Sequence, residues 1–283
     1  MKSRPRQPGL TLVETLVVVG IIAALVGLGL PAVRAMLRSF GSEESVRAMV
    51  QAGLSSARAM ALEQQRYVGV RFQKASFGPG DGLNNPQYMI FIVHDTRATD
   101  LATGFRAVEG IQPIRLPDLL GVMDLTVVTR SADGSDVLRE DLIRSDKGID
   151  TVAEVNDTTT FSMVFSPTGH LVVHDVRILN REGRRGSEAD PTKDSKSSSD
   201  DVFNTWAKIT DKGDPRGMFL QDDYPRRGLG PESSRRSFVV YQTREFEQAF
   251  RTGTGEAYSR YLAGLQSKVL YVAPLTGAIV SRN

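Results

Sequence analysis

The feature that most restricts this sequence is an apolar run close to its first residue. Residues 10–33 contain only Leu, Val, Ile, Ala, Gly, Thr and one Pro, apart from a single charged residue, Glu14. As a helix this run would extend about 36 Å, which is enough to cross a hydrocarbon core about 30 Å thick. Lys2, Arg4 and Arg6 precede the run and favour a cytoplasmic N-terminus. The sequence therefore predicts one membrane-spanning segment.

The apolar run has two simple interpretations. A secretory signal peptide usually has an apolar region of only about 7 to 15 residues, and no small-x-small cleavage pattern lies between Val33 and Phe40. A plain single-pass anchor is the other alternative. Neither explains Glu14, because a charge near the bilayer centre costs about 2.5–3.5 kcal/mol on insertion scales. Glu14 is therefore expected to have a cationic partner.

Cleavage of the chain after Gly9 would provide that partner. The new amino group on Leu10 would lie about 6 Å from Glu14 along one helical face. In an assembly of staggered helices, Glu14 could instead contact the amino terminus of a neighbouring chain and so select the register of packing.

At these positions the sequence resembles the type IV prepilin family, which includes the pseudopilins of type II secretion. The resemblance rests on the basic leader, the apolar run and five residues within or before it: Gly9, Thr11, Leu12, Glu14 and Pro31. It implies that a prepilin peptidase cuts after Gly9, that Leu10 becomes the N-methylated first residue, and that Glu14 and Pro31 serve filament assembly. The family usually has Phe at the position of Leu10.

The resemblance also implies the partners and the location of the chain. The partners would be the prepilin peptidase, other pilin or pseudopilin subunits, an inner-membrane assembly platform and membrane lipid. The chain would pass once through the inner membrane, with its N-terminus in the cytoplasm and its head domain outside. After assembly it would belong to a filament.

The remaining pattern predicts a helix followed by strands. Apolar residues recur at spacings of three and four between Val46 and Ala61, which indicates an amphipathic helix over residues 34–66. The expected fold class is therefore α+β and pilin-like, with a long N-terminal helix packed on an antiparallel β-sheet head domain. The expected divisions are a leader (1–9), an assembly helix (10–33), an amphipathic stem (34–66) and a β-rich head (67–283) with a flexible insertion at about 181–236.

Several short segments of the head read as strands. Residues 68–72 alternate between apolar and polar side chains, residues 88–93 form an apolar run, and residues 122–129 are a third candidate. Pro167 and Gly169 suit a type I turn of a hairpin. Together with the Ala-rich end of the stem, this hairpin resembles that of the H-type minor pseudopilins. Further strands are expected at 237–241, 268–272 and 278–281.

No motif of catalysis, metal binding or cofactor binding is present in the sequence. The chain has no cysteine, and its three histidines do not have the spacing of metal ligands. The glycines between Gly78 and Gly82 match neither a Walker A loop nor a dinucleotide fingerprint. We therefore expect no enzyme activity, no metal and no cofactor.

Two arginine doublets provide a tentative anion-binding site. Arg226 with Arg227, and Arg235 with Arg236, could contact phosphates if they converged in space. The formal net charge of +2 and the interleaved acidic residues favour an ordinary charged surface instead. Nucleic acid is therefore not expected as the main partner, although it stays an alternative.

The sequence as a whole predicts a pseudopilin or minor pilin, assembled into a type II secretion pseudopilus or a type IV pilus-like filament. One alternative is a minor pilin that binds DNA for uptake. The other is an unrelated domain held outside the cytoplasm by a single-pass anchor.

Overall fold

A computed structural model describes residues 42–76, 85–131, 137–142, 151–183, 198–211, 217–224, 227–251 and 256–281. By its internal contacts the chain divides into Met1–Ser42 and Glu43–Asn283, and every described helix and strand belongs to the second unit. The predictions for Gly9, Leu10, Glu14 and Pro31 therefore lie outside the described residues.

The first described element is helix α2 (Glu43–Gln64), which has one buried face. Glu43 and Glu44 occupy its first turn, where negative charge is favourable beside the positive end of the helix dipole. The helix ends before Gln65, whose φ of 52° is left-handed. Gly53 allows close contact with the sheet, because a Cβ at this position would lie 2.4 Å from the Met89 sulfur atom. Its buried positions are Val46, Val50, Gly53, Leu54, Ala57 and Ala61.

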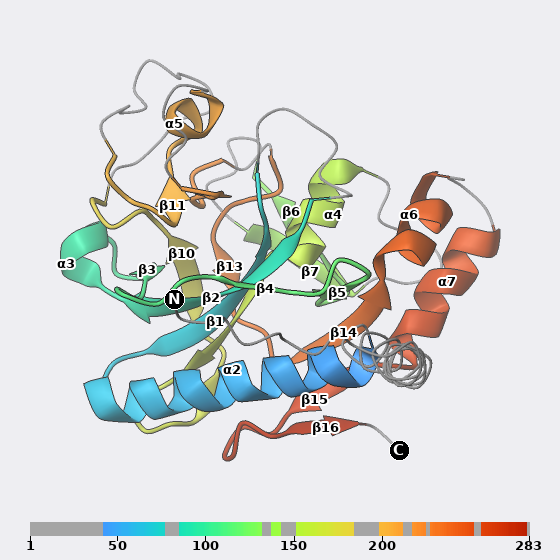
Figure 1. Cartoon of the computed structure of the whole chain (residues 1–283), viewed down its shortest axis with the longest axis horizontal. Coiled ribbons are helices and arrows are strands. Elements are labelled where there is room, and N and C mark those ends of the chain that lie inside the picture. The colour runs from blue at the N-terminus through green and yellow to red at the C-terminus, as the bar shows by residue number, and fades with distance from the viewer. Residues whose placement is uncertain are drawn as a thin grey trace, which may run out of the picture. The chain divides into compact units, whose positions relative to one another are not determined.

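Helix α2 packs against one face of an eight-stranded sheet (Figure 1). The strand order is β13-β10-β3-β2-β1-β8-β9, and β4 pairs with β2. The central pairs are antiparallel, whereas β3 and β10 are parallel. The strands are β1 (Val68–Lys74), β2 (Gln87–His94), β3 (Gly104–Ala107), β4 (Ile114–Arg115), β8 (Phe161–Phe165), β9 (Leu171–Val172), β10 (Asp175–Ile178) and β13 (Glu232–Ser233).

A four-stranded sheet with the order β16-β15-β14-β5 extends the surface beneath α2. Its strands are β5 (Leu120–Met123), β14 (Ser237–Gln242), β15 (Leu270–Val272) and β16 (Ile279–Ser281). Alternate residues of β14 face opposite sides: Phe238 and Val240 join the core beneath α2, whereas Val239 and Tyr241 pack against helices α6 (Thr243–Arg251) and α7 (Glu256–Gln266).

The second face of the eight-stranded sheet is covered by the described parts of residues 198–236. Phe203 and Phe219 of this segment share an apolar cluster with Ile90 and Ile92 of β2. The segment contains β11 (Phe203–Asn204), helix α5 (Trp206–Thr210), β12 (Phe219–Leu220) and strand β13. The sequence suggested a flexible insertion at 181–236, and the structure describes only part of that range, in which Phe203, Phe219 and Tyr224 are fully buried.

Three shorter elements complete the described domain. Strands β6 (Thr126–Arg130) and β7 (Val137–Leu142) form a two-stranded sheet, and helix α4 (Val152–Thr159) has a capping box formed by Thr151 and Glu154. Helix α3 (Thr96–Thr99) follows β2 and is capped by the Asp95 side chain.

The fold class expected from the sequence is wrong. The described residues are mainly β-rich, and their larger sheet is curled like a half-barrel and mixed rather than antiparallel. Among the described residues the first helix is α2, which begins at Glu43, so no long N-terminal helix is shown. Sequence periodicity identifies strands but not their partners, so it could not reveal that β10 joins β3 in parallel across many intervening residues. Among the helices that the structure describes, none has the length and apolar character needed to span a bilayer.

Candidate functional site: a buried network of arginines and carboxylates

The centre of this network is Arg71, which lies in the middle of strand β1 with a side chain only 1% exposed. Val70 and Phe72 point toward α2, so Arg71 points toward the segment that covers the other face. Its guanidinium contacts the Asp222 carboxylate, lies 3.3 Å from Glu232 Oε1, and donates from Nε to Gln73 Oε1 at 2.8 Å. Arg71 thus joins the sheet to two carboxylates of the 198–236 segment.

A second arginine, Arg235, lies beside the first. Its Nε donates to Asp124 Oδ2 at 2.6 Å, and its Nη1 donates to Glu140 Oε2 at 2.7 Å. The Ser162 hydroxyl donates to Glu232 Oε1 at 2.9 Å. These bonds connect strands β7, β8 and β13 with the loop that follows β5.

The two guanidinium groups of Arg71 and Arg235 face four carboxylates, so full ionisation would leave excess negative charge in a buried place. The pKa of Glu232 is raised to about 8, mainly by burial and to a smaller extent by the neighbouring Asp222 and Asp124, while Arg71 and Arg235 act in the opposite direction. Burial likewise raises the pKa of Asp124 to about 7, although Arg235 opposes the shift. The network can therefore hold a proton near neutral pH.

Two further ion pairs surround the network. Arg130 Nη2 lies 2.7 Å from Asp157 Oδ1 of α4, and Arg177 Nη2 of β10 lies 2.7 Å from Asp223 Oδ1. Every carboxylate named here contacts a guanidinium. The arrangement is suited to fixing the 198–236 segment on the sheet rather than to reacting with a substrate.

The arginine doublets predicted from the sequence have different partners in the structure. Arg226 lies outside the described residues. Arg227 places its guanidinium 3.7 Å from the centre of the Trp206 ring, whereas Arg235 belongs to the buried network and Arg236 is exposed. Within the part of the chain that the structure describes, Arg227 and Arg235 have different contacts, so an anion site formed by the doublets stays a prediction.

Two of the histidines lie side by side, which the sequence did not indicate. The rings of His94 and His174 are 5.6 Å apart and also contact Tyr67 and Phe105. His170 is the histidine nearest to His174 along the chain, but the pairing of β3 with both β2 and β10 brings His174 close to His94 instead. Within the described ranges no group of three His, Cys, Asp or Glu side chains is placed to hold a metal ion.

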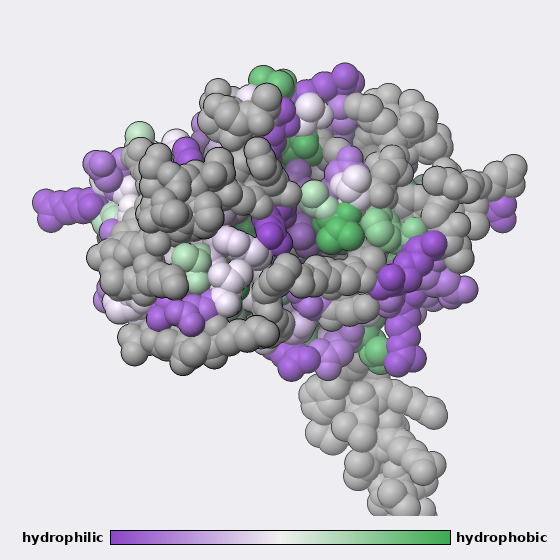
Figure 2. Space-filling view, turned by 90° about the horizontal axis from the view of Figure 1, so that it is seen from above, coloured by the Kyte–Doolittle hydropathy of each residue, from purple (hydrophilic) through white to green (hydrophobic). Residues whose placement is uncertain are grey.

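The middle of the outward face of α2 carries small side chains. Ala48, Ala52, Ser55, Ser56 and Ala59 are exposed, and they recur at helical spacing opposite the buried face. Close approach of another helix to this face would meet little steric obstruction. On the different face shown in Figure 2, hydrophilic and hydrophobic residues are interspersed among those that are coloured.

Comparisons with known proteins provide no further assignment of this site. No protein family, no curated protein and no solved structure matches the chain.

Proposed function

We propose that the chain is a membrane-inserted filament subunit, processed in the manner of a type IV prepilin and assembled into a type II secretion pseudopilus or a related pilus. The observation that carries the proposal is the sequence from Gly9 to Glu14 at the start of the apolar run. An acidic residue at this depth is unfavourable unless a cation neutralises it, and a cut after Gly9 creates that cation.

In this proposal the inner membrane holds residues 10–33 before assembly, with the domain that starts at Glu43 outside the cytoplasm. The prepilin peptidase removes residues 1–9, and an assembly platform then transfers the subunit from the membrane into the filament. Contacts between subunits, rather than catalysis, are the activity of the chain.

The described domain adds one supporting feature. Helix α2 is its first element and begins ten residues after the apolar run ends at Val33. The small residues on the exposed face of α2 would allow a neighbouring subunit to approach closely.

A substitution at Glu14 tests the proposal. Glu14→Ala should leave membrane insertion unchanged, because it lengthens the apolar run without shortening any part of it, but it should abolish co-assembly with partner subunits. Glu63→Ala is the matched control, because Glu63 is an exposed carboxylate of α2. Co-assembly is measured by cross-linking and by recovery of filaments sheared from cells.

Normal filaments from Glu14→Ala would contradict the proposal and leave a single-pass anchor as the better interpretation. Equal loss of assembly in Glu63→Ala would also contradict it, since the effect would then not depend on the charge in the apolar run.

A further inference from the structure

The rings of His94 and His174 lie next to each other where β2 ends and β10 begins. Their centres are 5.6 Å apart, and both rings also contact Tyr67 and Phe105. His94 is the last residue of β2, and His174 directly precedes β10. Each histidine is half-buried, so part of its surface is open to solvent.

One nitrogen of each ring is hydrogen-bonded to a backbone carbonyl group. His94 Nε2 lies 2.7 Å from the Ala102 carbonyl oxygen, and His174 Nδ1 lies 2.6 Å from the carbonyl oxygen of Asp175. A carbonyl oxygen can only accept a hydrogen bond, so each of these two nitrogens carries a proton and donates it. In a neutral imidazole the second nitrogen then has a free lone pair.

The two nitrogens with lone pairs are His94 Nδ1 and His174 Nε2. Neither forms a hydrogen bond within the described part of the chain. Histidines that bind metal ions almost always donate their other N–H to a carbonyl, a carboxylate or water, which fixes the tautomer and the orientation of the ring. His94 and His174 therefore both have the hydrogen-bond arrangement of a metal ligand.

The distance between the rings also suits a single metal ion. An ion about 2.0–2.1 Å from one nitrogen of each ring holds the ring centres about 5 Å apart in tetrahedral coordination. The observed 5.6 Å differs from this by no more than a small side-chain rotation can supply. The backbone of the pair is fixed, because the His94 N–H donates to the Tyr67 carbonyl at 2.9 Å and the His174 N–H donates to Ser234 Oγ at 2.9 Å.

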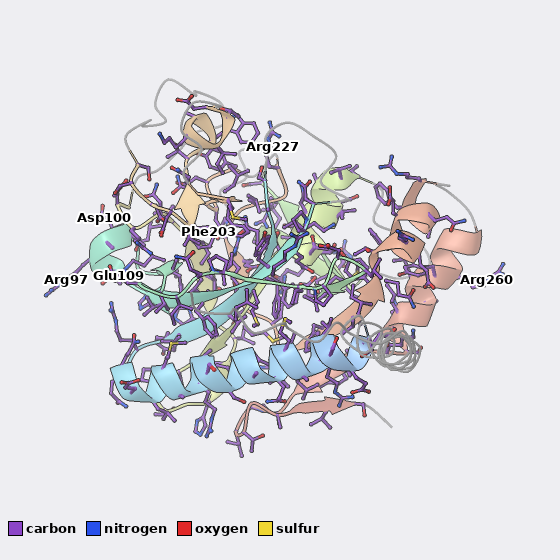
Figure 3. All side chains as sticks on the ribbon, viewed as in Figure 1. Arg97, Asp100, Glu109, Phe203, Arg227 and Arg260 are labelled. Atoms are coloured by element: carbon purple, nitrogen blue, oxygen red, sulfur yellow. The ribbon has the colours of Figure 1, made fainter. Side chains whose placement is uncertain are left out.

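The arginines that neighbour the pair make other contacts. Arg66 and Arg106 both contact the Asp95 carboxylate, and Arg97 of α3 projects away from the sheet (Figure 3). Within the described ranges none of the three donates to a histidine ring. A cation beside the two lone pairs would therefore displace no hydrogen bond of the described residues.

We infer that His94 and His174 form a binding site for one divalent transition-metal ion such as Zn²⁺ or Cu²⁺. Neutral imidazole nitrogens suit these ions, whereas Mg²⁺ and Ca²⁺ prefer oxygen ligands. Water would complete the coordination, because no third His, Cys, Asp or Glu of the described ranges joins the pair.

The sequence predicted no metal site, because the two histidines are far apart along the chain and meet only through the pairing of β3 with β2 and β10. The inference goes beyond the proposed filament function and does not depend on it.

Calorimetric titration of the full chain, purified in detergent micelles without a histidine tag, tests this inference with ZnCl₂ and CuCl₂ as probes. The parent chain should bind one ion of either metal, and Cu²⁺ more tightly than Zn²⁺. MgCl₂ should not compete for the site. The variants His94→Gln and His174→Asn remove the lone pair and keep an amide that can donate to the same carbonyl. Each should weaken Zn²⁺ binding about tenfold or more, since loss of a group that only orients a ligand already costs about 10–100-fold.

His170→Gln is the matched control, because His170 is the third histidine of the chain and is exposed between β8 and β9. This control should bind Zn²⁺ as the parent chain does. Circular dichroism establishes that each variant is folded.

Absence of Zn²⁺ and Cu²⁺ binding at millimolar concentration would overturn the inference. It would also be overturned if the folded variants His94→Gln and His174→Asn bound Zn²⁺ as tightly as His170→Gln. An equal loss of affinity in all three variants would have the same meaning, because the ions would then bind to histidines in general rather than to this pair.

Discussion

Arg71 is the residue on which the packing of the 198–236 segment most depends. A guanidinium that is 1% exposed has lost its hydration, and two carboxylates with a glutamine oxygen replace the lost water contacts. A buried ion pair of this kind adds little stability compared with apolar side chains that replace the whole pair. Removing only one member is costly, because the other members then stay buried without a counter-charge.

The substitution Arg71→Met should therefore destabilise the protein by about 3–5 kcal/mol. The control Arg97→Met, on the exposed surface of α3, should change the free energy of unfolding by less than about 0.5 kcal/mol. Urea unfolding of the full chain in micelles, followed by circular dichroism, measures both. A loss at Arg71 no larger than that at Arg97 would show that the network does not hold the fold.

The raised pKa of Glu232 determines the direction in which stability should change with pH. Its folded-state pKa of about 8 lies above its ordinary value of 4.5, and that of Asp124, about 7, lies above 3.8. The folded state therefore binds more protons than the unfolded state in this window, and the contribution of these groups is lost as pH rises through the folded pKa values. We expect the urea concentration at the unfolding midpoint to decrease as the pH is raised from 5 to 8. In the variant Glu232→Gln this decrease should be smaller. A midpoint that rises across this range, or an unchanged slope in the variant, would show that the carboxylates are ionised throughout.

At the scale of elements, Gln51 of α2 secures the hairpin formed by β15 and β16. Its Nε2 donates to the Gly277 carbonyl at 3.0 Å, and its Oε1 accepts from the Ile279 amide at 2.7 Å. The side chain thus pairs with backbone groups at the free edge of β16 that would otherwise be unsatisfied.

Gln51→Ala should cost about 1–2 kcal/mol, since each net hydrogen bond contributes about 0.5–1.5 kcal/mol. The loss should be local, with faster amide hydrogen exchange at Ile279 and little change in α2. Gln64→Ala, at the exposed end of α2, is the control. Unchanged exchange at Ile279 would show that strand pairing alone holds the hairpin.

The elements that the sequence predicted best are those with local signals. Alternation over 68–72 and the apolar run 88–93 correspond to β1 and β2, and Pro167 with Gly169 marks the turn between β8 and β9. The strand expected over 122–129 is instead divided into β5 and β6, because Leu125 has a φ of 55°. Such a break depends on the tertiary contacts of Asp124, which no local pattern reveals.

The candidate site was harder to predict than the strands. Arg71 reads as the polar member of an alternating strand, which is typical of a solvent-facing position, yet a segment about 150 residues later covers it. The sequence identified Arg227 as a candidate anion-binding residue together with Arg235. In the structure Arg227 instead stacks on Trp206, and Arg235 pairs with Asp124.

At the scale of the whole described domain, the network makes the sheet and the 198–236 segment unfold together. Trp206 is the only tryptophan of the chain and lies in this segment, where its backbone amide donates to the Tyr224 hydroxyl at 2.7 Å. Its fluorescence therefore reports on the segment, whereas circular dichroism reports on all elements. We expect the two urea transitions to coincide. An earlier transition by fluorescence would show that the segment detaches while the sheet stays folded.

The proposed function depends on cleavage of the chain after Gly9, and the intact mass of the protein purified from membranes measures this cleavage most directly. The chain should begin at Leu10 and carry one added methyl group, and it should keep Met1 in cells that lack a prepilin peptidase. A mature protein that still begins at Met1 in cells with an active peptidase, or one cut after Val33, would contradict the proposed function.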